Sequence, residues 1–125
     1  MDILNSGFIK NNNYKLISLD KENGICIMEG LITDTSYNPF LIVHGGYIFG
    51  LADTTAGILA NCLIDDCVTM NSTIDYLHPI KGNKVISEAK CLKKGKLISV
   101  FEVSIYDEKR LLLAHSNITY CKLNK

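Results

Sequence analysis

The stretch from Val43 to Asp53, VHGGYIFGLAD, holds the residues of this chain that are best suited to chemistry. His44, Gly45 and Gly46 precede an apolar run, and Asp53 follows the histidine by nine positions. If the run is a helix, its free backbone N–H groups and the positive end of its dipole lie at the glycines. Such donors favour negative charge, including the oxyanion that develops during acyl transfer.

The residues that must position this stretch have the pattern of one long helix from Gly45 to about Ile64. Apolar and small side chains recur along it at helical spacing, at Ile48, Leu51, Ala52, Thr55, Leu59 and Cys62. Glycines at positions 46, 50 and 57 lower its intrinsic helicity by up to about 1 kcal/mol each relative to alanine. We therefore expect packing to hold this helix.

Asp53 shares one helix face with the glycines at 46, 50 and 57. The residue could be a solvent-facing aspartate on a glycine-marked surface, or a carboxylate aimed into a narrow ligand groove. Gly45 and Asp53 lie about 12 Å apart along the helix, at about 1.5 Å per residue, so one active site cannot take both from one helix. Two antiparallel helices could pair one N-terminus with the other Asp53, which predicts a dimer with interfacial sites.

The rest of the chain has the pattern of strands. Residues 14–20 and 25–32 form two short strands joined by a turn at Gly24. After position 66, four long strands follow in sequence with short turns between them, which predicts an antiparallel meander. The sequence therefore predicts one α+β domain over residues 1–125, with one helix against one antiparallel sheet.

Composition excludes several classes of protein. The 13 Lys and Arg residues balance the 13 Asp and Glu residues, so no basic excess suggests a nucleic-acid partner. No run of about 18 apolar residues and no signal-peptide core occurs, so we expect a cytoplasmic protein without a membrane partner. Five scattered cysteines without a C-x-x-C pair predict reduced thiols and no zinc site.

The pattern N-x5-HGG-x-IF-x-LAD over residues 38–53 resembles the hotdog-fold acyl-CoA thioesterases of the phenylacetate-pathway type. The later TMNSTIDYLHPIKG resembles the next strand of that family, and KKGKLISVFEVSIYDEKRLLLAHSNITY resembles its closing hairpins. The resemblance covers nearly the whole chain from about Tyr14. It implies a six-stranded sheet around a long helix, a homodimer that commonly forms a homotetramer, and hydrolysis of acyl-CoA without metal or cofactor.

The resemblance also implies roles for five residues. Gly45 matches the glycine whose backbone N–H binds the thioester oxygen. Asp53 matches the catalytic carboxylate, which acts across the interface as general base or nucleophile. Asn38 matches the residue that helps to hold the water or the thioester, and Thr69 lies where the family often has Ser or Thr near the attacking water. His44 matches the motif histidine, which shapes the loop.

Family members use basic residues near a hairpin turn to bind the CoA phosphates, which indicates Lys93, Lys94 and Lys96 here. The chain departs from the family at Leu41, because a glycine often stands three residues before the motif histidine. We expect Pro39 and Leu41 to stiffen and fill the loop that positions Asn38.

Two other functions stay open from the sequence. A hotdog protein could bind or sense acyl-CoA without catalysis, although binding alone needs no acid at Asp53. A hydratase or dehydratase of this fold would need a histidine and an acid placed differently on the helix.

Overall fold

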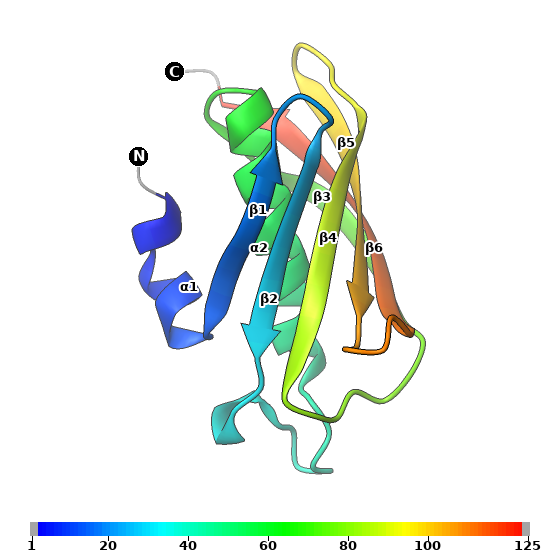
Figure 1. Cartoon of the computed structure of the whole chain (residues 1–125). Coiled ribbons are helices and arrows are strands. Elements are labelled where there is room, and N and C mark those ends of the chain that lie inside the picture. Colours follow the sequence, from blue (N-terminus) through cyan, green and yellow to red (C-terminus); the bar gives the residue numbers. More distant parts are fainter. Residues whose placement is uncertain (1–2, 124–125) are drawn as a thin grey trace.

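The computed structural model describes residues 3–123. The elements in chain order are η1 (Ile3–Asn5), α1 (Gly7–Asn11), β1 (Tyr14–Asp20), β2 (Ile25–Leu31), η2 (Asp34–Ser36), α2 (Gly45–Leu63), β3 (Cys67–Tyr76), β4 (Lys84–Lys93), β5 (Ile98–Tyr106) and β6 (Leu112–Lys122). The strands form one curved antiparallel sheet around α2 (Figure 1). The predicted hotdog arrangement is confirmed, and α2 begins at the predicted residue.

The strand order is β1-β2-β4-β5-β6-β3, and every neighbouring pair is antiparallel. Strands β4, β5 and β6 form a meander, but the prediction that β3 continues it was wrong, because β3 pairs with β6. Alternation in the sequence shows which face of a strand is buried, and it carries no information on which strand lies alongside. The correction makes β3 an edge strand of the sheet.

Helix α2 lies against the concave face of the sheet (Figure 1). Five of the six residues predicted to face the core are fully buried, namely Ile48, Leu51, Ala52, Thr55 and Leu59. Cys62, the sixth, is only half-buried. The buried hydroxyl of Thr55 is hydrogen-bonded to the Leu51 carbonyl and to the Ser87 hydroxyl, both at 2.7 Å, so its burial leaves no polar atom unsatisfied.

The chain before β1 has helical structure that the sequence did not predict. The Ser6 side chain caps α1 by accepting a hydrogen bond from the backbone N–H of Phe8 at 3.2 Å. The ring of Phe8 lies against that of Tyr14, with centroids 5.8 Å apart, and Ile9 is buried. Helix α1 therefore covers the edge of the sheet beside β1 (Figure 1).

The five cysteines are free thiols in the structure. Burial raises the pKa of Cys26 to about 12, which keeps that thiol protonated at neutral pH. Within residues 3–123, no helix is long and apolar enough to cross a membrane. The same residues contain no cluster of histidine, cysteine and acidic side chains with the geometry to hold a metal ion.

Candidate active site

Asp53 lies half-buried in the middle of α2, where two hydroxyl groups reach the same carboxylate oxygen. Thr69 of β3 donates a hydrogen bond to Oδ1 at 2.6 Å. The hydroxyl of Tyr120 in β6 lies 3.0 Å from the same oxygen and 2.7 Å from the Asp53 backbone carbonyl. No described residue is hydrogen-bonded to Oδ2. The structure thus brings Asp53 and Thr69 together, fixes one carboxylate oxygen and leaves the other available.

Tyr120 belongs to this site although the sequence analysis did not single it out. The side chain is 3% exposed and meets Phe101 edge to face. Burial and the nearby Asp53 carboxylate raise the pKa of its hydroxyl, so the group remains a protonated donor. A Cβ at Gly57 would lie 3.3 Å from the Tyr120 hydroxyl. Glycine at this position therefore leaves room for the tyrosine.

The glycines on the Asp53 face do not form an open groove along their whole length. Gly50 is buried, and a Cβ there would lie 2.7 Å from the Tyr14 hydroxyl and 3.0 Å from the Phe8 ring. The Tyr14 hydroxyl donates to the backbone carbonyl of Tyr47 at 2.6 Å. Gly50 thus admits a tyrosine that braces α2, as Gly57 does. The narrow ligand groove that the sequence left open as one alternative therefore does not extend along the whole glycine face.

The first turn of α2 is held by two hydrogen bonds to one peptide group. His44 is the N-cap residue, and its Nδ1 accepts from the Gly46 N–H at 2.8 Å. The Tyr76 hydroxyl donates to the Gly45 carbonyl at 2.7 Å. Because Nδ1 is an acceptor, the imidazole proton lies on the exposed Nε2. The Gly45 N–H has no acceptor among residues 3–123, so it is available to a ligand.

Asn38 organises the loop before this turn. Its Oδ1 accepts from the backbone N–H groups of Phe40 at 2.9 Å and Ile42 at 3.3 Å. The side-chain oxygen is therefore occupied by its own loop, and the amide nitrogen is the atom left to act on a ligand. Asn38 and Gly45 line one cavity of about 310 Å³, together with Ile48, Tyr76, Leu77 and Ile80.

Leu41 adopts a backbone conformation that glycine takes more easily. Its φ is +62°, in the left-handed region, and this φ gives a physical reason for a glycine at the position. The side chain is 76% exposed. The expectation that Leu41 fills the loop was wrong, because its side chain points into solvent.

The candidate residues lie in two separate groups within one chain, as two halves of the candidate site. Asp53 does not line the cavity that contains Gly45, and it lies about 12 Å further along α2, at about 1.5 Å per residue. Thr69, which bonds Asp53, lies near the beginning of β3, whereas Tyr76, which bonds Gly45, is its last residue. One chain therefore presents each half at a different end of its edge strand.

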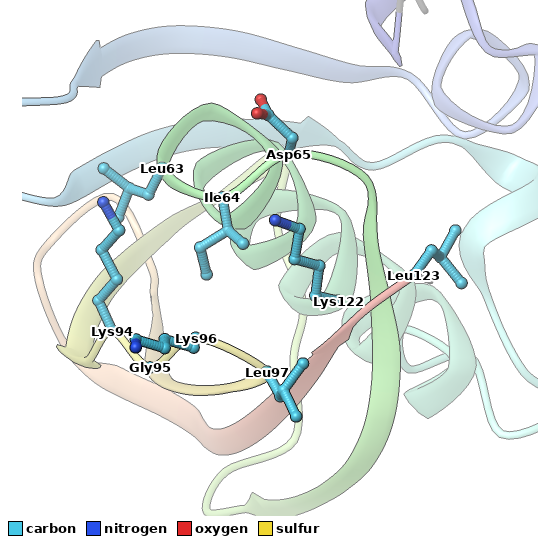
Figure 2. Close-up of a pocket in the computed structure, with 9 residues that line it drawn as sticks. All are labelled: Leu63, Ile64, Asp65, Lys94, Gly95, Lys96, Leu97, Lys122 and Leu123. Atoms are coloured by element: carbon cyan, nitrogen blue, oxygen red, sulfur yellow. The ribbon is translucent and has the colours of Figure 1, made fainter. Parts of the chain in front are cut away.

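The three predicted lysines lie at or near the turn between β4 and β5, and only two of them line a cavity. Lys94 and Lys96 line a cavity of about 650 Å³ at the C-terminal end of α2 (Figure 2), whereas Lys93 is not among its lining residues. Lys122 of β6 completes the group and was missed by the sequence analysis. The carboxylate of Asp65 points away from the cavity (Figure 2). We call Lys94, Lys96 and Lys122 the lysine cluster.

Comparison with known proteins gives consistent matches. The family model described as the thioesterase superfamily matches residues 40–114. The chain is 29% identical to ComA2 of Bacillus subtilis, over 80% of this chain and 82% of that protein. It is 28% identical to acyl-coenzyme A thioesterase PaaI of Escherichia coli, over 79% of this chain and 70% of PaaI.

Solved structures extend the likeness to the whole fold. The E. coli PaaI structure has a TM-score of 0.89 at 25% identity, over 96% of this chain and 86% of that one. A Streptococcus mutans protein solved with bound acetyl-CoA has a TM-score of 0.83 at 28% identity, over 90% of each chain. The resemblance predicted from residues 38–53 is therefore confirmed.

Proposed function

The chain belongs to the thioesterase superfamily, and we propose that it hydrolyses the thioester bond of aryl- or short- to medium-chain acyl-CoA. The observation that carries the proposal is the Asp53 carboxylate, with Oδ1 fixed by Thr69 and Tyr120 and Oδ2 free. A binding site alone has no need of an oriented carboxylate. The thioesterase name of PaaI and the acetyl-CoA in the S. mutans protein support the substrate class.

The complete site would form between two copies of the chain. Strand β3 is an edge strand, and Val68, Met70 and Leu77 leave apolar surface exposed along it or just after it. In this proposal β3 pairs antiparallel with its copy, in the register that sets Thr69 opposite the partner subunit's Tyr76. Asp53 of one subunit would then face the Gly45 cavity of the other. The homodimer is the minimal active unit in this proposal, and two dimers form the homotetramer.

Hydrolysis follows from the groups at this interface. The Gly45 N–H of one subunit binds the thioester oxygen and stabilises the oxyanion, with the Asn38 amide nitrogen beside it. As general base, Oδ2 of Asp53 takes a proton from water, and the hydroxide attacks the carbonyl carbon. The C–S bond then breaks, and the proton passes from Asp53 to the CoA thiolate. As nucleophile, Oδ2 would attack the carbon itself and expel the CoA thiolate as the C–S bond breaks, and water would then hydrolyse the resulting anhydride to the free acid and the Asp53 carboxylate.

For the CoA phosphates we propose the lysine cluster as the binding site. Three ammonium groups around an apolar floor of Leu63, Ile64 and Leu97 favour an anionic ligand (Figure 2). Lys93 lies beside the cluster in the sequence and would contribute only long-range attraction. Neutralising Lys94 and Lys122 together should raise KM for acyl-CoA and leave kcat nearly unchanged.

A thiol-release assay across aryl- and alkyl-acyl-CoA substrates tests the proposal. We expect turnover by the wild-type protein and a loss of about 10²- to 10⁴-fold in kcat for Asp53→Asn, with the fold and oligomer intact. Glu22→Gln, an equally small change in the exposed β1–β2 turn, is the matched control. Near-normal turnover by Asp53→Asn would exclude the assigned role. Tight acyl-CoA binding without thiol release by the wild type would favour the binding protein instead.

A further inference from the structure

Another cavity, of about 460 Å³, begins beside Asp53 and extends along the C-terminal half of α2. Gly57 lines it four positions after Asp53, so these two residues are neighbours on the helix surface, and Thr54 lines it directly after Asp53 in the chain. Val68, which precedes Thr69, lines it from β3. Asp53 does not itself line the cavity, but it lies within one helical turn of Gly57, which does, and none of the functions above uses this space.

Apolar side chains from three parts of the chain form the walls. Ile3, Phe8 and Ile9 of the N-terminal segment face Ile58 of α2 and Val68 of β3. Gly57 leaves the helix side of the cavity without a side chain that would narrow it. Ile9 and Ile58 are each 6% exposed, so these walls belong to the packed structure. The N-terminal segment, which the sequence analysis left without a role, thus builds one side of the cavity.

The far end of the cavity is acidic. Asp65 and Asp66 line it there, and both side chains are exposed. Asn61 also lines this end, but its amide group is hydrogen-bonded to the backbone of Gly57 and Cys67. The cavity is therefore mostly apolar along α2 near the carboxylate and negatively charged at its far end.

We propose that this cavity receives the acyl group of the substrate and selects an acyl group that is uncharged and apolar. The inference rests on the proposed thioesterase function, because it needs the thioester carbon at Asp53. One of the two arms of the substrate must then enter the cavity. The phosphates of the CoA arm would be repelled by Asp65 and Asp66, whereas an alkyl or aryl group gains free energy by burial against the isoleucines and Phe8.

Two consequences follow. An acyl group that ends in a carboxylate should be a poor substrate, because its charge would meet the acidic end. The lysine cluster adjoins this cavity, since Asp65 and Leu123 line both. If the acyl group of one substrate fills the space between Asp53 and the lysine cluster, the same substrate cannot also place its phosphates at that cluster. Phosphates bound at the cluster would then belong to a CoA whose thioester lies in another subunit of the tetramer.

The test measures kcat/KM for straight-chain substrates from acetyl-CoA to dodecanoyl-CoA in wild type, Ile58→Phe and Phe8→Ala. Ile58→Phe fills the cavity and Phe8→Ala removes an apolar wall. Each should lower kcat/KM for the best long-chain substrate about tenfold or more relative to acetyl-CoA. Leu111→Ala, an exposed leucine that lines none of the cavities described above, is the matched control and should keep the wild-type ratio. Circular dichroism checks the fold of each variant, and Phe8, which is half exposed, tests the wall if Ile58→Phe is poorly folded.

Charge selection is tested with glutaryl-CoA against pentanoyl-CoA, which have equally long acyl groups. Wild type should prefer pentanoyl-CoA about tenfold or more, and Asp65→Asn should narrow the difference. If wild type releases thiol but Phe8→Ala and Asp65→Asn leave every ratio unchanged, the inference is overturned and the thioesterase function stands. An equal loss for all chain lengths with weaker inhibition by CoA would place the CoA arm in the cavity, which also overturns it. No thiol release from any substrate would remove the proposed function and this inference with it.

Discussion

Thr69 and Tyr76 lie seven positions apart on β3, and each hydroxyl bonds a residue of α2 that belongs to a different half of the candidate site. Thr69 holds Asp53, and Tyr76 holds the peptide group of Gly45. If two copies of β3 pair antiparallel with Thr69 opposite the partner subunit's Tyr76, the Asp53 half of each subunit meets the Gly45 half of the other. The dimer would then contain two complete sites, one at each end of the paired strands. The spacing of the two hydroxyls along one strand thus sets the register in which a dimer would be active.

Gly45→Pro should remove the proposed oxyanion donor while keeping the helix. Gly45 is the first residue of α2, where proline is favoured, and His44 has the extended conformation that precedes proline well. Loss of the N–H should lower kcat about 10²- to 10³-fold, measured by thiol release.

Gly45→Ala is the matched control for this change. Its Cβ would lie 3.2 Å from the Tyr76 ring, as the proline Cβ would, but alanine keeps the N–H. Equal losses for the two variants would assign the effect to crowding of Tyr76 and would contradict the donor role.

Mixing Asp53→Asn with Gly45→Pro should restore activity that neither variant has alone. In a mixed dimer, one site receives both substitutions and the other receives none. With random exchange of subunits, half of the dimers are mixed, so about a quarter of wild-type kcat should return. Thiol release before and after exchange measures the gain. The control is a mixture of the two pure variants in which the subunits have not exchanged. If thiol release does not rise after subunit exchange has been demonstrated, each active site lies within one chain.

The sequence predicted some parts of this arrangement well, and the physical reasons differ between elements. The apolar spacing over residues 45–64 was sufficient for α2, because a core helix must bury one face. The pairing of β3 with β6 was missed, because strand periodicity does not name a neighbour. Tyr120 was missed because, in the sequence, a tyrosine at an inward position of a strand cannot be distinguished from an ordinary residue of the hydrophobic core. Its contact with Asp53 exists only once β6 lies beneath α2.

Tyr120→Phe should lower kcat with little change in KM. The substitution keeps the buried ring against Phe101 and removes the hydroxyl that orients Asp53. A carboxylate held by Thr69 alone should be misplaced often enough to cost about 10- to 100-fold in kcat. Tyr106→Phe, which removes a hydroxyl from β5 outside the site, is the control. A Tyr120→Phe enzyme with wild-type kcat and a lower unfolding free energy would assign Tyr120 to stability only.

Leu41→Gly should raise the free energy of unfolding by up to about 1 kcal/mol, because glycine adopts the left-handed φ of +62° without the penalty that leucine carries. The exposed side chain contributes little packing that would offset the gain. Urea unfolding of Leu41→Gly and of the control Leu41→Ala separates the two effects, since alanine removes the side chain and keeps the strained backbone. Equal stability of the two variants would show that the backbone of this loop costs the fold nothing. A rise for glycine alone would show that the chain carries strain in the loop that positions Asn38.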